Sequence, residues 1–90
     1  MTRNDLRIRG MELDPTVQVG KAGLTEQIGR EISEQLEKRE LIKVRFLRSA
    51  GPSSEWKQSV EGLSRRIGAE LIEIKGATVL LYKRKGLKGR

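Results

Sequence analysis

The sequence predicts an α/β fold: a two-layer sandwich of a four-stranded mixed sheet, with two long helices on one face and a short N-terminal helix. Apolar residues recur at helical spacing near residues 25–39 and 54–67, and they alternate with polar residues in four shorter segments. Right-handed crossovers would place both long helices on the same face of the sheet. A chain of 90 residues, 36% of them hydrophobic, closes one modest core, so a single domain is expected.

The N-terminal segment has two interpretations. Thr2 and Asp5 have the spacing of a capping box, which predicts a short helix as far as Arg9. Leu6 and Ile8 also alternate with charged residues, as they would in a strand. The helix is the preferred interpretation.

The first strand and the first long helix follow. Val17 and Val19 alternate with polar residues after Pro15, which predicts a short strand. The next helix is expected to run from its N-cap, Thr25, to about Arg39, because apolar residues recur every four positions. These residues are Ile28, Ile32 and Leu36.

The second half of the chain predicts a strand, a helix and a hairpin. The strand contains Ile42, Val44 and Phe46 and is expected to end at Gly51 and Pro52. Ser53 or Ser54 is expected to cap the helix, which Gly68 ends. Its apolar stripe comprises Trp56, Val60, Leu63 and Ile67. Gly76-Ala77 then fits a type II′ turn between two strands.

The hairpin register and the core follow from these elements. If Lys75 faces Thr78, then Ile74 faces Val79 and Ile72 faces Leu81. These four apolar residues would share one face of the sheet. A single core is therefore expected from Ile28, Ile32, Leu36, Val44, Phe46, Trp56, Val60, Leu63, Ile67, Ile72, Ile74, Val79 and Leu81.

The residue inventory excludes several kinds of site. The chain has no cysteine and no histidine, which removes disulfides, thiolate metal sites, cysteine nucleophiles and histidine bases. No enzymatic activity and no cofactor are therefore expected. The longest apolar run, residues 78–82, is far shorter than the roughly 20 residues of a membrane span. With no apolar signal region at the N-terminus, a cytoplasmic protein without membrane contact is expected.

The positive charge is concentrated at the C-terminus. The net charge is +7, yet residues 83–90 hold five basic residues and no acid. The remaining residues carry fourteen basic and twelve acidic side chains, a net of +2. We expect residues 1–84 to form the folded domain and residues 85–90 to form a flexible basic tail. The positive net charge predicts that the protein binds an anionic partner.

A short glycine loop lies between the first strand and the first long helix. It consists of Gly20, Lys21, Ala22 and Gly23, and Thr25 follows. One interpretation is a phosphate clamp, because glycines let backbone amides approach an anion and a helix N-terminus adds its positive dipole end. The other is a plain strand-to-helix turn that needs glycine at positive φ.

The segment VQVGKAGLTEQIGREISEQLEKRELIKV, residues 17–44, resembles the CRM domain of the bacterial and archaeal YhbY-like family. The resemblance continues through the closing strand, residues 76–82. It implies a fold like the C-terminal domain of bacterial translation initiation factor three, and RNA binding through a KH-like Gly-x-x-Gly loop. It also implies association with precursors of the large ribosomal subunit. The family's first helix is usually longer and more basic than the one expected here.

The candidate RNA-binding residues combine this loop with nearby cations. They are Gly20, Lys21, Ala22, Gly23, Thr25, Lys43, Arg45, Arg48, Lys83, Arg84 and Lys85. Arg30, Lys38 and Arg65 each follow a glutamate by four positions and are instead expected to form ordinary helix ion pairs.

Recognition of the RNA backbone and shape is favoured over base stacking. The chain has only three aromatic residues; Trp56 is expected in the core, and Tyr82 is expected to pack rather than to stack on a base. The expected partner is rRNA or a pre-ribosomal particle, bound by a monomer. A protein-interaction adaptor and a binder of other structured RNA, such as tRNA or an intron, remain alternatives.

Overall fold

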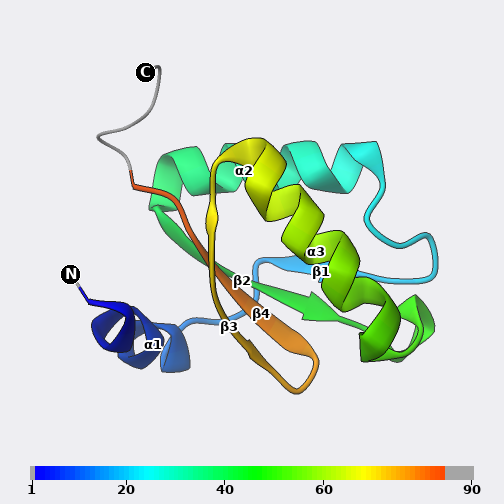
Figure 1. Ribbon diagram of the computed structural model, residues 1–90, viewed down its shortest axis with the longest axis horizontal. Helices are drawn as coiled ribbons and strands as arrows, with labels where there is room; N and C mark the ends of the chain where they lie inside the picture. Colours follow the sequence, from blue (N-terminus) through cyan, green and yellow to red (C-terminus); the bar gives the residue numbers. More distant parts are fainter. Residues whose placement is uncertain (1, 85–90) are drawn as a thin grey trace.

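The computed structural model describes residues 2–84 and confirms the predicted fold class (Figure 1). The chain forms α1 (Arg3–Met11), β1 (Val17–Val19), α2 (Glu26–Arg39), β2 (Leu41–Phe46), α3 (Ser53–Ile67), β3 (Glu70–Lys75) and β4 (Thr78–Tyr82). The strand order in the sheet is β1-β2-β4-β3. β1 and β2 are parallel, and both pairings that involve β4 are antiparallel.

The helix interpretation of the N-terminal segment is confirmed, and α1 extends two residues past Arg9. The Asp5 amide donates to the Thr2 hydroxyl at 3.1 Å, and the Thr2 amide donates to the Asp5 carboxylate at 3.2 Å. This is the predicted capping box. The hydrogen bond from the Thr2 backbone, reinforced by its side chain, holds the pKa of Asp5 below its ordinary value.

The long helices agree with prediction except at the start of α3. Thr25 caps α2 by accepting from the Ile28 amide at 3.2 Å, and Gly68 ends α3 in the left-handed conformation, with φ of 73°. The predicted serine cap of α3 is wrong. Pro52 is the N-cap residue, and Ser53 and Ser54 both lie inside the helix. The proline ring holds Pro52 at φ of −69°, so the chain turns into the helix without a side-chain cap.

Strand β2 is shorter than expected at its C-terminal end. It ends at Phe46, before a 3₁₀ turn, η1 (Arg48–Ala50), rather than at Gly51 and Pro52. Backbone hydrogen bonds from Ala50 to Leu47 and from Gly51 to Arg48 close this turn. The backbone groups that leave the sheet are therefore paired locally, which ends the strand early.

The hairpin register is confirmed near its turn and wrong further along. Lys75 pairs with Thr78 and Ile74 with Val79, and Gly76 has the positive φ expected for the turn. A register shift between Leu71 and Glu73 then pairs Leu71, not Ile72, with Leu81. The extra residue moves Leu71 and Ile72 to the faces opposite to those predicted.

Arg3 explains why the bulge is tolerated at this place. Its guanidinium donates to the Leu71 carbonyl at 3.1 Å and to the Ile72 carbonyl at 3.0 Å, and it also contacts the Glu70 carboxylate at 3.4 Å. Strand β3 lies at the edge of the sheet, so these carbonyls have no neighbouring strand to pair with. The arginine therefore satisfies the backbone that the bulge exposes and ties α1 to the sheet edge.

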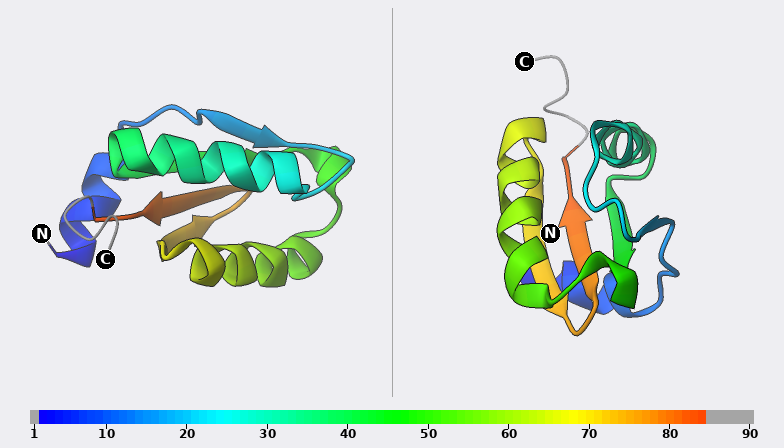
Figure 2. Two further views of the ribbon diagram at one scale, coloured as in Figure 1. Left: turned by 90° about the horizontal axis from the view of Figure 1, so that it is seen from above. Right: turned by 90° about the vertical axis from the view of Figure 1, so that its right-hand side faces the viewer.

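The prediction of one core is also wrong, because the sheet buries apolar residues on both faces. The larger cluster lies between the sheet and the two long helices, α2 and α3, which Figure 2 shows at an angle to each other. It contains all the predicted core residues except Ile72, with Ile28, Ile67 and Ile74 only partly buried. It also contains Val17, Val19 and Ile42, which the predicted core omitted.

The smaller cluster packs α1 against the opposite face of the sheet. It joins Leu6 to Leu41, Ile72 and Leu80. Helix α1 approaches the sheet closely at Gly10, where an added Cβ would lie 2.5 Å from a methyl group of Leu80. The short helix therefore packs on the part of this face that carries Leu41, Ile72 and Leu80.

Candidate nucleic-acid interface

The glycine loop forms a tight turn between β1 and α2. The Gly23 amide donates to the Gly20 carbonyl at 2.9 Å, and Gly23 has φ of +75°. Gly23 therefore has the positive φ that a strand-to-helix turn needs, which glycine adopts without strain, and this conformation is compatible with either interpretation of the loop. An added Cβ at Gly23 would meet nothing within 4 Å, so the turn faces open space.

The turn and the start of α2 present several backbone amides together. Lys21 and Ala22 occupy the two central positions of the turn, and their amides donate to no partner within residues 2–84. In α2, the Thr25 hydroxyl and carbonyl accept from the Ile28 and Gly29 amides. The Glu26 and Gln27 amides belong to the first turn and have no partner within the helix. Such a group of N–H donors suits an anion.

Two of the predicted cations lie beside this turn. The Leu47 amide donates to the Val19 carbonyl at 2.8 Å, which places η1 next to the glycine loop. An added Cβ at Gly20 would lie 3.4 Å from the Ser49 hydroxyl. Arg45 and Arg48, which flank this junction, are both exposed, as is Lys21. The fold therefore brings Lys21, Arg45 and Arg48 to one end of the sheet.

A row of polar residues crosses the sheet at this end. Gln18 pairs with Arg45, Arg45 with Thr78, and Thr78 with Lys75, so these four residues cross all four strands on the face opposite α2 and α3. Lys43 lies two residues from Arg45 on the same face. Lys75 was missed from the sequence, because its position beside Arg45 depends on the strand order.

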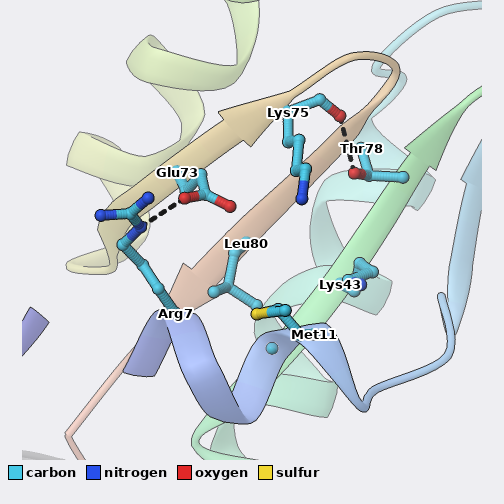
Figure 3. Close-up of a pocket in the computed structure, with 8 residues that line it drawn as sticks. Arg7, Met11, Lys43, Glu73, Lys75, Thr78 and Leu80 are labelled. Carbon is cyan, nitrogen blue, oxygen red and sulfur yellow. Dashed lines mark hydrogen bonds and ion pairs between the residues drawn. The ribbon is translucent and has the colours of Figure 1, made fainter. Parts of the chain in front are cut away.

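A cavity of about 390 Å³ lies on this face, between α1 and the hairpin (Figure 3). Lys43, Lys75 and Thr78 line it together with Arg7, Glu73 and Leu80. The Arg7 guanidinium forms an ion pair with Glu73, so each charge in that pair is compensated. Lys43 and Lys75 have no ion-pair partner within residues 2–84, and they give the cavity its net positive charge.

The predicted cations near the C-terminus lie at the other end of the sheet. The Lys83 amide donates to the Glu40 carbonyl at 2.8 Å, next to the start of β2, whereas the glycine turn lies near the end of β2 (Figure 1). The length of β2 separates these ends by roughly 17 Å. Lys83 and Arg84 are therefore not part of the cluster around the turn, and Lys85 lies outside the described residues.

The expected helix ion pairs do not form in the described part of the chain. No salt bridge joins Arg30, Lys38 or Arg65 to the glutamate four residues before it. The two ion pairs that residues 2–84 do show, Arg3–Glu70 and Arg7–Glu73, hold α1 on the sheet. Exposed ion pairs at this spacing stabilise a helix by only about a few tenths of a kcal/mol, so solvation of the two separate charges competes with ion-pair formation.

The aromatic residues lie where they were expected. Trp56 is buried in the main core and stacks on Phe46, with ring centroids 4.0 Å apart. Tyr82 packs against the smaller cluster. Within residues 2–84, no group of three acidic side chains is arranged to hold a metal ion, and no helix has the length and apolar character to cross a bilayer.

Comparison with known proteins gives consistent matches over nearly the whole chain. The family model of the CRS1 / YhbY (CRM) domain matches residues 1–83. The Bacillus subtilis protein named "Probable RNA-binding protein YqeI" is 39% identical over 79 residues, which cover 87% of this chain and 79% of the relative.

An archaeal relative and a solved structure extend these matches. The Methanocaldococcus jannaschii protein named "Probable RNA-binding protein MJ0652" is 33% identical over 92% of this chain, and the match spans 62% of that protein. The solution structure of protein SAV1595 from Staphylococcus aureus matches with a TM-score of 0.77 and 33% identity. That match covers 91% of this chain and 83% of the solved chain.

Proposed function

Because this chain belongs to the CRS1/YhbY (CRM) family, we propose that it is a non-catalytic RNA-binding protein that binds rRNA during assembly of the large ribosomal subunit. The names of two relatives support RNA as the partner. The likeness to YhbY-like proteins supports the choice of large-subunit rRNA. A cytoplasmic monomer is part of the same proposal.

One observation carries the proposal: free backbone amides and exposed cations meet at one end of the sheet. The amides belong to the glycine turn and the start of α2, and the cations are Lys21, Arg45 and Arg48. These three cations have no ion-pair partner within the described chain. Amides and cations together suit a phosphodiester backbone, which carries one negative charge per nucleotide.

Crosslinking in cells, followed by sequencing of the attached RNA, tests the proposed partner. We expect reads from large-subunit rRNA and its precursors to exceed their share in a control that carries the Gly23→Asp variant. Enrichment of tRNA or intron RNA instead would keep RNA binding and overturn the proposed target.

The basic tail should add affinity without adding specificity. Deleting residues 85–90 removes three positive charges, so the salt dependence of binding should weaken by up to about two to three units in log–log slope. The ranking of RNA ligands should not change, because charged residues meet phosphate wherever it lies. Filter binding of several rRNA fragments at four salt concentrations measures both quantities. A changed ranking would mean that the tail reads RNA structure.

A second candidate function, a protein-interaction adaptor, is favoured by two exposed apolar residues on α1. Ile8 is 54% exposed and Met11 is 69% exposed, and both lie beside β3. Exposed apolar side chains that lie together mark contact surfaces more often than isolated ones do. If the Gly23→Asp variant no longer copurifies with rRNA in a salt-sensitive way, RNA binding is supported. If copurification with rRNA instead depends on Ile8 and Met11, the adaptor is supported.

A further inference from the structure

A groove opens on the side of the molecule that carries α2 and α3, beside the residue that follows the glycine turn. It has a volume of about 530 Å³ and is lined by Leu24, in the segment before α2, and by side chains of α3 between Gln58 and Arg66. Leu24 directly follows Gly23, and among the described residues it is the one lining residue outside α3. The groove therefore continues the surface on which the proposed RNA-binding turn lies.

Gly62, in the middle of α3, lines this groove and has no structural reason to be glycine. Its φ is not positive, and an added Cβ would meet nothing within 4 Å. By contrast, an added Cβ at Gly29 on α2 would lie 3.3 Å from Leu63, so Gly29 serves the contact between the helices. Glycine inside a helix is less favourable than every residue except proline. Gly62 therefore weakens α3 and leaves room in the groove.

Besides two leucines and Gly62, the groove is lined by two cations and two neutral polar side chains. Arg65 and Arg66 lie one turn beyond Gly62, and Gln58 and Ser59 lie one turn before it. Neither arginine has an ion-pair partner in residues 2–84, although Glu61 precedes Arg65 by four positions. No acidic side chain of residues 2–84 lines the groove. An anionic ligand with hydrogen-bonding groups is complementary to this surface.

We propose that this groove holds a second stretch of RNA sugar–phosphate backbone, continuous with the stretch bound at the glycine turn. The inference rests on the proposed function and extends it. Gly62 lets the strand approach α3 closely, Arg65 and Arg66 bind phosphates, and Gln58 and Ser59 are placed to bond sugar hydroxyls. A protein segment fits less well, because protein interfaces are anchored by buried apolar and aromatic side chains, and the exposed large apolar residues of the described chain, Ile8 and Met11, lie on α1.

Substitutions at Gly62 test the groove without weakening the helix. Gln and Glu are both good helix formers of similar size, so Gly62→Gln and Gly62→Glu should melt at or above the parent temperature. We expect Gly62→Gln to weaken binding of a large-subunit rRNA transcript about threefold by filling the groove. Gly62→Glu should weaken it at least tenfold by adding a charge that repels phosphate.

Asn4→Glu is the matched control for net charge. Asn4 is exposed on α1, on the other side of the sheet, and Glu there gives the same change in charge as Gly62→Glu. Asn4→Glu should lower affinity less than twofold. If Gly62→Glu also bound within twofold of Asn4→Glu, the groove would not contact RNA.

The double variant Arg65→Ala, Arg66→Ala provides a second readout. Loss of two phosphate contacts should lower the log–log salt slope by about 1.4 to 1.8, whereas a merely structural role would leave the slope unchanged. Gly23→Asp, measured beside it, separates the two proposals. If Gly23→Asp loses affinity and the groove variants do not, RNA binding stands and the groove proposal fails. If the parent protein shows no salt-dependent binding to the transcript, both proposals fail.

Discussion

Replacing Gly23 with aspartate should lower the affinity for a large-subunit rRNA transcript at least about tenfold, or 1.4 kcal/mol. The side chain would extend into open space in front of the turn, where the proposed phosphate approaches the Lys21 and Ala22 amides. A carboxylate there repels phosphate and occupies its position. Fluorescence anisotropy with labelled RNA at fixed salt measures the loss.

Gly23→Asn is the matched control for this change. Gly23 has φ of +75°, and asparagine and aspartate adopt this conformation more readily than other non-glycine residues. The two variants should therefore melt at similar temperatures, and they differ only in charge. Gly23→Asn should keep most of the affinity. If the aspartate variant bound within twofold of the asparagine variant, the loop would be only a turn, and the sheet face with Lys43 and Arg45 would become the leading site.

Lys21 should matter less than Gly23. Its side chain is exposed and supplies one charge among several, so Lys21→Ala should lower the affinity only a fewfold and reduce the salt slope by less than about one unit.

Truncating Trp56 to alanine should lower the free energy of unfolding by about 3 to 5 kcal/mol. Trp56 is 7% exposed and Phe46 is 2% exposed, and their rings stack with an angle of 7° between planes. The substitution would leave a cavity and remove the ring pair that joins α3 to β2. Such a loss is a large fraction of the stability of a small domain.

Urea unfolding, followed by circular dichroism, measures this loss. Trp56→Phe is the control, because it keeps an aromatic ring against Phe46 and should recover most of the stability. A urea midpoint for Trp56→Ala close to that of the parent would contradict the role of this pair in the core.

The elements that the sequence predicts correctly depend on local patterns. The stripes of α2 and α3 follow from helical spacing, and Gly68 ends α3 because glycine adopts the left-handed conformation found there. The hairpin at Gly76 likewise has its signal within a few residues. Each of these features is decided by side chains that are neighbours in sequence.

The errors arise where residues distant in sequence decide the structure. The bulge beside Ile72 depends on hydrogen bonds from Arg3, which lies 69 residues away. The smaller cluster needs α1 to fold back onto Leu41 and Leu80, and α1 has few apolar residues with which to predict this. The alternation of apolar and polar residues within a single strand predicts neither contact.

In the candidate site, too, local sequence patterns predict some features, whereas others depend on residues distant in the sequence. The glycine turn and the helix start behind it are contiguous in the chain, so the sequence places them together. Strand order and direction decide which cations join them. The pairing of Arg45 with Thr78 brings Lys75 to the same row, whereas the antiparallel course of β4 takes Lys83 and Arg84 to the far end.

The effect of RNA on the backbone amide resonances of the ¹⁵N-labelled protein tests directly whether the glycine turn binds RNA. On addition of a large-subunit rRNA fragment, we expect the largest shifts at the Lys21, Ala22, Glu26 and Gln27 amides, with smaller shifts near Arg48. These shifts should shrink as salt rises, because phosphate contacts are electrostatic. Unchanged amides at the turn, with the largest shifts at Tyr82, Lys83 and Arg84, would contradict the proposal that the glycine turn binds RNA.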